Sequence, residues 1–124
     1  MATQDTCCTI VPYFKVNPGK LDEFKALAEK AVAETSKNSA EEKVLYYGFS
    51  YSGEVAHCRE GYADAEGALA HLANINPLLQ QLLEVSELAR LEIHGPAAEL
   101  DKMRAPLAAL SPDFFTLECG VRPE

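Results

Sequence analysis

Two hydrophobic periods divide the chain into predicted strands and helices. β-Branched and aromatic residues gather in five segments that we expect to be strands, at residues 7–16, 43–52, 55–62, 87–94 and 113–121. Apolar residues recur with the period of a helix in three other segments, at 18–37, from 64 onward, and from 97 onward after Gly95-Pro96. Each helical stripe is wide enough to cover one face of a sheet.

Capping and turn residues place the ends of these elements. We expect Asn17 to cap the first helix, with Pro18 at its first position, and residues 52–54 to form the tight turn of a β-hairpin. Asp64 is the expected cap of the second helix. Pro77 predicts a break in that helix at 74–77, followed by a further short helix, because proline cannot donate the backbone hydrogen bond of a helix interior.

The order of the elements predicts the fold class. It reads β-α-β-β-α-β, followed by α-β, without linker, repeat or low-complexity tract. The first six elements match the ferredoxin-like pattern, an α+β fold whose antiparallel sheet is covered by helices on one face. We therefore expect a single domain over residues 1–124, with its core at about 7–121.

The uncovered face of this sheet predicts a partner. Apolar and aromatic residues occupy both alternation sets of 44–51, with Val44 and Tyr46 in one set and Leu45, Tyr47, Phe49 and Tyr51 in the other. A sheet that is apolar on both sides needs a second layer, and the chain has too few helices to supply one. A homodimer packed sheet to sheet is the simplest solution.

Composition narrows the classes of partner. The chain has 124 residues, 48% of them hydrophobic, and a formal net charge of −8 from 11 basic and 19 acidic residues. This balance argues against nucleic acid and anionic membrane surfaces as partners, because both need a clustered basic face. No apolar run approaches the roughly 20 residues that span a bilayer, and the N-terminus lacks a secretory pattern, so we expect a cytoplasmic protein.

The four cysteines predict buried thiols rather than disulfides or metal ligands. Cys7 and Cys8 are adjacent and point to opposite faces of a strand, and Cys58 and Cys119 lie in apolar surroundings. There is no C-x-x-C motif, and His57 beside Cys58 is too little for a zinc site. The sequence also lacks a G-x-S-x-G elbow, a Gly-rich phosphate loop, an H-E-x-x-H helix and a flavin or nicotinamide motif. We therefore expect no metal and no cofactor.

Two stretches resemble a known family. They are VPYFKVNPGKLDEFKALAEKAVAET and HCREGYADAEGALAHLANINPLLQQLLEVSELARLEIHGPAAELDKMRAPL, the second followed by FFTLECG. Together they resemble the antibiotic biosynthesis monooxygenase (ABM) domain proteins of the dimeric α+β barrel superfamily, over residues 8–121. The resemblance implies a homodimer with a small pocket in each subunit between sheet and helices. Its members include cofactor-free oxygenases of phenols and quinols, heme-degrading enzymes, an isomerase and proteins without known activity.

The resemblance also implies candidate residues. A Y…E-A…H pattern places a histidine at His71 on the second helix, and an imidazole near neutrality can take a proton from a phenol or an enolisable carbon. The alternative is a histidine at the edge of the core, bonded to a backbone carbonyl or to solvent. Heme-degrading members use a Trp together with a His, and this chain has no Trp.

Tyrosines and one glutamate complete the candidate site. Tyr62 lies just before the second helix and can orient a polar aromatic substrate, as can Tyr47; the alternative is that these rings fill a core. Glu60 shares a strand face with Tyr62, where apolar neighbours would raise its pKa and make it a base. Asn74 follows His71 by three residues and is a further candidate for contact with substrate.

Three functions remain open from the sequence. The first is a cofactor-independent monooxygenase of a small quinol or phenol, in which the substrate anion itself gives an electron to dioxygen, with His71 as base and Tyr62 as orienting group. The second is an isomerase or other proton-transfer enzyme, for which Arg59 or Arg90 would bind an anionic substrate. The third is a small-molecule-binding or structural dimer without catalysis. Otherwise Arg59, Arg90, Glu92, His57 and His94 are expected to form a cross-strand charge network.

Overall fold

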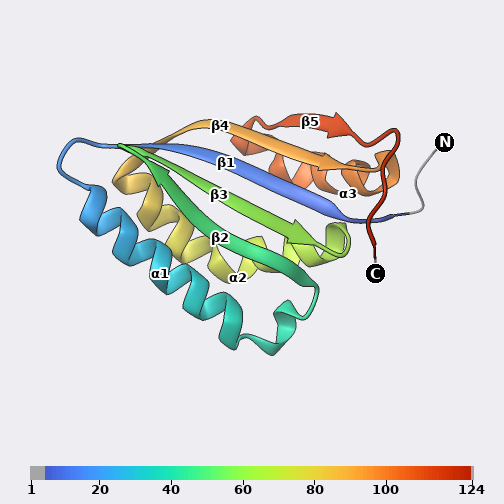
Figure 1. Ribbon diagram of the computed structural model, residues 1–124, viewed down its shortest axis with the longest axis horizontal. Coiled ribbons are helices and arrows are strands. Elements are labelled where there is room, and N and C mark those ends of the chain that lie inside the picture. The colour runs from blue at the N-terminus through green and yellow to red at the C-terminus, as the bar shows by residue number, and fades with distance from the viewer. Residues whose placement is uncertain (1–4, 124) are drawn as a thin grey trace.

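A five-stranded sheet backed by helices on one face forms the molecule (Figure 1). The structure is a computed structural model, and it describes residues 5–123. The strands are β1 (Cys8–Val16), β2 (Val44–Ser52), β3 (Val55–Tyr62), β4 (Ser86–Gly95) and β5 (Asp113–Thr116), and the α-helices are α1 (Leu21–Lys37), α2 (Ala65–Glu84) and α3 (Ala97–Leu107). Short 3₁₀ turns follow α1 and α3, at η1 (Ser39–Glu41) and η2 (Ala108–Leu110).

The strand order β2-β3-β1-β4-β5 confirms the ferredoxin-like α+β fold. The first four strands pair antiparallel, and β5 adds to β4 in parallel at the edge. All three helices lie behind the same face of the sheet, so that the other face is open (Figure 1). Within residues 5–123, no helix combines the length and the apolar composition that crossing a bilayer requires.

Two apolar clusters fill the space between sheet and helices. One packs the β1, β3 and β4 side chains against the start of α2 and against α3, around Tyr62, Ile93 and Leu100. The other packs α1 and the end of α2 against the sheet, around Phe24 and Leu82. The helix α2 contributes to both clusters, and it therefore carries the side chains that lie between them.

The predicted break in α2 is wrong. The helix continues through Pro77, which lies inside it and is exposed. Leu72, Ile75, Leu79 and Leu82 all contribute to its inner face, and their packing outweighs one missing backbone hydrogen bond. The predicted cap at Asp64 is confirmed, since its side chain accepts a hydrogen bond from the Gly67 N–H at 2.9 Å.

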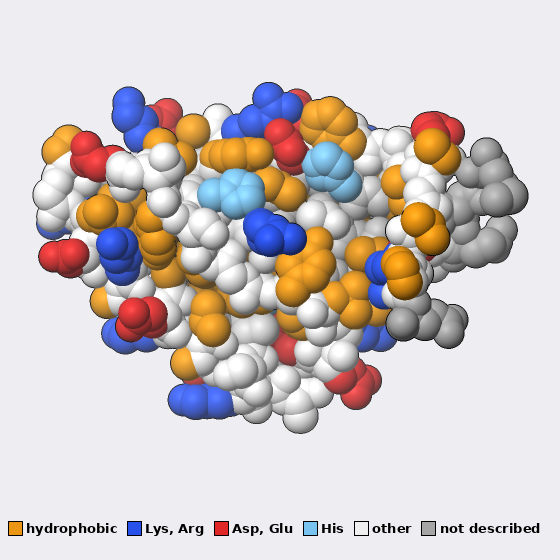
Figure 2. All heavy atoms as spheres, viewed as in Figure 1, with side chains coloured by type: hydrophobic (Ala, Val, Ile, Leu, Met, Phe, Trp, Pro, Cys, Tyr) orange, Lys and Arg blue, Asp and Glu red, His pale blue; other side chains and the backbone are white. Residues whose placement is uncertain are grey.

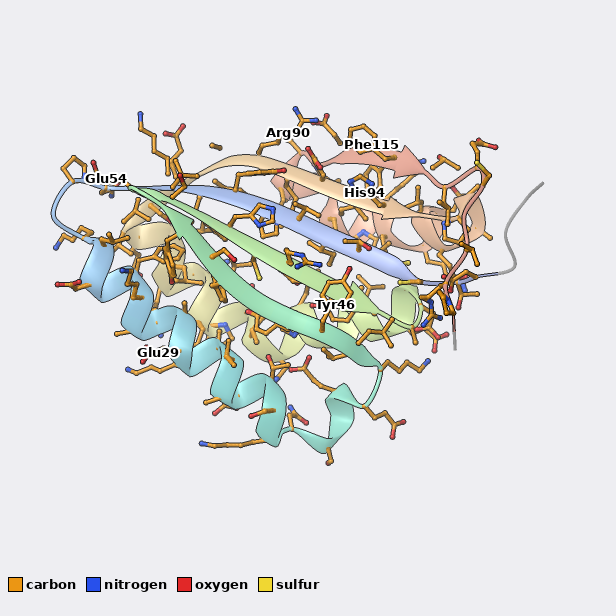
Figure 3. All side chains as sticks on the ribbon, viewed as in Figure 1. Glu29, Tyr46, Glu54, Arg90, His94 and Phe115 are labelled. Carbon is orange, nitrogen blue, oxygen red and sulfur yellow. The ribbon has the colours of Figure 1, made fainter. Side chains whose placement is uncertain are left out.

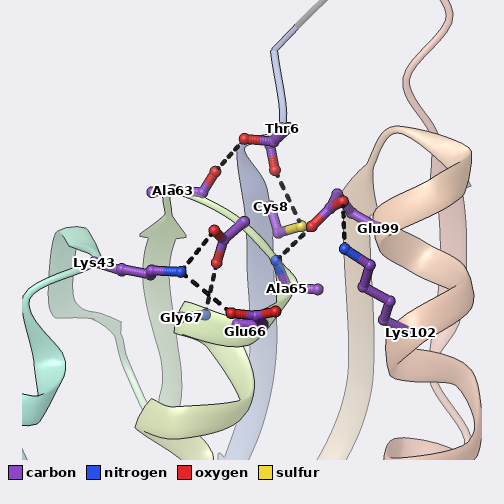
Figure 4. Close-up of polar contacts among 10 residues, drawn as sticks. Thr6, Cys8, Lys43, Ala63, Ala65, Glu66, Gly67, Glu99 and Lys102 are labelled. Carbon is purple, nitrogen blue, oxygen red and sulfur yellow. Dashed lines mark hydrogen bonds and ion pairs between the residues drawn. The ribbon is translucent and has the colours of Figure 1, made fainter.

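Polar contacts fix the start of α2 (Figure 4). Lys43 donates to the Asp64 carboxylate at 2.9 Å, and Glu99 on α3 accepts from the backbone N–H of Ala65 at 3.0 Å. Both contacts join the first turn of α2 to segments distant in sequence. They fix the rotation of the helix, and with it the side chains that face the sheet two turns later.

Two other predicted ends differ from the structure. The first helix begins at Leu21 rather than at Pro18, because Asn17 to Lys20 form a turn in which Gly19 has φ +78° and the Lys20 N–H donates to the Asn17 carbonyl. The last strand ends at Thr116 rather than at residue 121, and Cys119 is consequently exposed rather than buried. The cysteines are free thiols throughout the described chain.

The open face is less apolar than the alternation of 44–51 predicted. A register shift between Val44 and Tyr46 turns Val44 toward the helices, where it packs against the core. Charged, histidine and aromatic side chains share the open face instead (Figure 2). Tyr46, Arg90, His94 and Phe115 lie on it (Figure 3), and the His94 ring stacks on that of Phe115 with centroids 4.8 Å apart.

Candidate functional site

A largely apolar cavity lies between the helix-covered face of the sheet and α2. It has a volume of about 40 Å³. Its apolar walls come from β1, β2, β4, α2, and the end of α3 with η2: Ile10, Pro12, Phe14, Phe49, Leu72, Ile75, Leu79, Leu82, Leu88, Leu91, Ile93, Leu107 and Leu110. Leu72, Leu79, Leu88 and Leu110 are partly exposed, as are the lining residues Tyr47 and Phe49, so these side chains lie between the cavity and solvent.

The polar end of this cavity consists of Glu60, Tyr47 and Cys58. Glu60 and Cys58 point inward from alternate positions of β3, and Tyr47 comes from the neighbouring strand, where it pairs with Glu60. Glu60 is 5% exposed. The Tyr62 hydroxyl, fully buried, donates a hydrogen bond of 2.6 Å to Glu60 Oε1. The cavity therefore presents one carboxyl group to anything that occupies it.

His71 lies directly behind Glu60. Its side chain is fully buried, between the rings of Tyr47 and Tyr62, with centroids 4.4 and 5.3 Å from its own. Nε2 lies 3.7 Å from Glu60 Oε1, and Nδ1 lies 2.6 Å from Glu41 Oε1. No described residue forms a hydrogen bond with Nε2. The expected alternative, a histidine bonded to backbone or to solvent, is thereby excluded.

Glu41 holds the other side of the imidazole. It lies in the 3₁₀ turn after α1, with a side chain only 1% exposed. Asn74, one turn after His71 on α2, donates a hydrogen bond to Glu41 Oε2, and Asn38 donates one of 2.8 Å to the Asn74 side-chain oxygen. Asn74 therefore occupies Oε2 of Glu41, and Oε1 faces His71.

Burial dominates the electrostatics of the site. It raises the pKa of Glu60 above the ordinary value, while nearby His71 and the Tyr62 hydrogen bond act against this shift. Burial likewise raises the pKa of Tyr47, Tyr62 and Cys58, and the carboxylate of Glu60 adds to each of these shifts. The phenols and the thiol therefore stay protonated at neutral pH.

Four of the five predicted site residues come together here. His71, Tyr62, Tyr47 and Glu60 form one contact cluster, and the predicted raised pKa of Glu60 agrees with its burial. The fifth, Asn74, lies outside the lining of the cavity and binds Glu41. Glu41 itself was not predicted, because it lies in an irregular turn 30 residues before His71, where no periodicity marks it.

The other charged candidates lie elsewhere. Arg59 lies over the Tyr46 ring, 5.5 Å from its centroid, and Arg90 pairs with Glu92 at 2.6 Å, both on strands at the open face. Glu92 also contacts His94 at 3.2 Å, so three of the five residues of the predicted cross-strand network pair along β4 instead of across strands, and His57 packs against Tyr13. Among residues 5–123, no cluster of three His, Cys, Asp or Glu side chains is arranged to hold a metal ion.

Comparison with known proteins identifies a close relative. MupZ from Pseudomonas fluorescens is 44% identical to this chain; the match covers 99% of this chain and 94% of MupZ, with a TM-score of 0.91. Neither the protein-family models nor the curated proteins gave a match.

More distant structures share the fold. A Caulobacter crescentus CB15 protein assigned to the antibiotic biosynthesis monooxygenases is 21% identical, over 72% of this chain and 88% of its own, with a TM-score of 0.64. One from Nitrosomonas europaea with the same assignment is 16% identical, over 78% and 96%, with a TM-score of 0.66.

Proposed function

We propose that this chain, which belongs to the same family as MupZ and shares the fold of proteins assigned to the antibiotic biosynthesis monooxygenases, is a cofactor-independent enzyme acting on a small, uncharged and largely apolar molecule. One observation carries this proposal: a single carboxyl group, that of Glu60, lies at the polar end of an otherwise apolar cavity, in contact with Tyr62 and next to His71. A buried carboxyl with a raised pKa is suited to exchange a proton with a substrate near neutral pH.

The roles differ in one respect from those expected from the sequence. Glu60, and not His71, lines the cavity, so Glu60 is the group that touches substrate and His71 acts behind it. Tyr47 supplies a phenol at the same end of the cavity, and Tyr62 holds the Glu60 carboxyl in place. Neither Arg59 nor Arg90 lines the cavity, which favours an uncharged substrate over an anionic one.

Oxygenation of a phenol or quinol is the reaction that the names of the distant relatives favour. Glu60 in its ionised form takes the hydroxyl proton, and the resulting phenolate gives an electron to dioxygen. Overall, a phenol and dioxygen become a quinone and water, so that the substrate supplies every electron and the protein supplies only a base and a dry site.

Proton transfer without oxygen is the second candidate. The raised pKa of Glu60 favours it, because a raised pKa makes the carboxylate a stronger base, which can take a proton from one carbon and return it to another. Such an isomerisation needs no oxidant. The same residues carry out both reactions, and oxygen dependence distinguishes them.

The test is a panel of small phenols, quinols and enolisable ketones, incubated with the protein in air and under nitrogen, with oxygen uptake and product formation both recorded. We expect Glu60→Gln to lower the rate about 100-fold or more, and Glu42→Gln, which changes an exposed carboxylate outside the cavity, to leave it unchanged. Unchanged turnover in Glu60→Gln would contradict the proposal. Binding of these compounds without any turnover would instead favour a non-catalytic binding domain.

We also propose that the protein acts as a homodimer joined through the open face of the sheet, and that it works in the cytoplasm. The mixture of exposed aromatic and charged side chains on that face supports the first point, since Tyr46 and Phe115 are each 42% exposed there. The net charge of −8 supports the expectation that the protein does not bind nucleic acid.

A further inference from the structure

We propose that His71 and Glu41 form a proton relay that joins Glu60, at the end of the cavity, to a groove on the surface of the protein. This inference deepens the proposed function and rests on it. Glu60 lines the cavity, Glu41 lines the groove, and the fully buried imidazole of His71 lies between them.

The need for a relay follows from the walls of the cavity. Among the described residues, Glu60 is the only carboxyl group that lines it, and the other two ionisable groups there, Tyr47 and Cys58, have pKa values raised by burial and by Glu60 itself. Partly exposed leucine and aromatic side chains, Tyr47 among them, lie between the cavity and solvent. A proton that reaches Glu60 therefore has no ionisable acceptor along the cavity wall.

The groove lies on the opposite side of His71. Its volume is about 430 Å³, and it opens between the end of α1, η1 and the start of β2. Asn38, Glu41, Glu42 and Tyr47 are among its lining residues. Tyr47 lines both the groove and the cavity, so a single side chain separates the two spaces beside the His71 ring.

Hydrogen bonding sets the tautomer of the histidine. Nδ1 lies 2.6 Å from Glu41 Oε1, and in the relay we assign the ring proton to Nδ1, which donates it to the Glu41 carboxylate. The lone pair of Nε2 then faces Glu60 at 3.7 Å, and no described residue satisfies it. A shift of less than 1 Å would bring Glu60 within hydrogen-bond distance. A buried carboxylate that orients imidazole in this way leaves its other nitrogen ready to accept a proton.

The proton moves in three steps. The Glu60 carboxyl gives its proton to Nε2, which makes an imidazolium; the imidazolium gives its Nδ1 proton to Glu41; and Glu41 releases a proton into the groove. The reverse sequence returns a proton to Glu60 and restores the Nδ1–H form of His71. Among residues 5–123, the titratable groups in contact with the imidazole are Glu60 and Tyr62 from β3, Tyr47 from β2 and Glu41 from η1.

Asn74 and Asn38 act as positioning residues in this relay. Asn74 donates to Glu41 Oε2, and Asn38 donates to Asn74, so that the carboxylate is fixed with Oε1 toward His71. This gives a role to Asn74, which the sequence singled out but which lies outside the cavity lining.

The test measures, by nitrogen-15 NMR of the ligand-free protein, the rate at which the His71 Nδ1 proton exchanges with water. We expect Glu41→Gln to slow this exchange at least tenfold, because an amide accepts a hydrogen bond but not a proton. Glu42→Gln makes the same change at an exposed neighbour in the groove and should leave the rate unchanged. A purely structural role for Glu41 gives the opposite result, since looser packing speeds exchange.

A second pair of variants covers the case in which Glu41→Gln does not fold. Glu41→Asp keeps a carboxylate but moves it one methylene away from the imidazole. The His71 Nδ1 proton of this variant should exchange with water more slowly than that of the native protein, whereas Glu42→Asp should leave the rate unchanged. Equal rates for Glu41→Asp and Glu42→Asp, or for Glu41→Gln and the native protein, would overturn the relay. No substrate is used, so the relay can fail while turnover is found, and absence of turnover leaves the relay result standing.

Discussion

Glu60 makes the stability of the protein depend on pH. Its folded-state pKa is raised, so the folded protein binds a proton that the unfolded chain releases at about pH 4.5. The stability associated with this proton is fully present below that pH and is lost as the pH rises through the folded-state pKa. We expect Glu60→Gln to remove the loss, so that urea midpoints measured from pH 5 to 8 fall less steeply than those of the native protein.

Carboxylates with lowered pKa values do not contribute to the change in urea midpoint between pH 5 and 8. Asp5, Asp64 and Glu99 contribute stability that is lost only as the pH falls toward and below their ordinary values. A window above pH 5 therefore isolates Glu60 from them. A native protein whose midpoints fall no more steeply than those of Glu60→Gln would show that burial of this carboxyl has no cost.

The Tyr62 hydroxyl is expected to stabilise the fold through Glu60. Tyr62→Phe removes the donor of a fully buried hydrogen bond of 2.6 Å and leaves Glu60 Oε1 without it. An unsatisfied buried acceptor costs about 1–3 kcal/mol, and the pKa of Glu60 should rise further because the lost bond had lowered it. Denaturant unfolding measures the first effect. Tyr46→Phe, at an exposed ring, should change stability by less than about 0.5 kcal/mol.

Individual site residues were predictable to different degrees. Tyr62 and Glu60 alternate along one strand, so their shared face followed from the period of two, whereas the burial of that face could not be read from the sequence. Placement of His71 needed the family pattern, because helical periodicity alone put it at the edge of the stripe. Glu41 could not be found, since only tertiary contact brings a residue of an irregular turn to that imidazole.

Helix α2 positions His71, and its start is expected to control that position. Asp64→Ala removes the cap bond to the Gly67 N–H and the contact with Lys43, and should cost about 1–2 kcal/mol. Glu66→Ala removes only a longer, exposed contact of 3.4 Å with the same lysine and should cost far less. Equal losses in the two variants, measured by denaturant unfolding, would show that the cap contributes nothing.

The stability lost in Asp64→Ala should depend on pH in one direction. The Lys43 hydrogen bond holds the pKa of Asp64 below its ordinary value of 3.8, so its contribution is present above that pH and is lost as the pH falls through the folded-state pKa. The difference between native protein and Asp64→Ala should therefore shrink in acid.

Element ends were less predictable than element types. Every predicted strand and helix is present, because each shows its own period over several residues. The break at Pro77 was wrong because its exposed ring costs one hydrogen bond while four inward side chains favour a continuous helix. The last strand was predicted too long, because composition alone does not reveal where pairing with β4 ends.

At the scale of the whole molecule, the fold could be predicted from the order of its elements, whereas the character of the open face could not. A bulge between Val44 and Tyr46 changes which side chains point outward, and no sequence period marks it. This face carries the exposed rings of Tyr46 and Phe115. On it Glu92 pairs with both Arg90 and His94, and Arg59 lies over the Tyr46 ring. Aromatic and arginine side chains are enriched at protein interfaces. A dimer is therefore still expected, because of these side chains and not because the face is apolar.

Light scattering tests whether the protein is a dimer and, with variants, which face forms the interface. At micromolar concentration we expect a mass of about 27 kDa, twice the 13.5 kDa of one chain. Tyr46→Glu replaces an aromatic ring on the open face by a carboxylate and should shift the protein toward 13.5 kDa, because removing that charge from water at an interface is costly. Val32→Glu, at a similarly exposed apolar residue that lies on α1 and not on the open face, should leave the dimer intact. A monomeric native protein would contradict the dimer, and dissociation by Val32→Glu alone would move the interface to the helices.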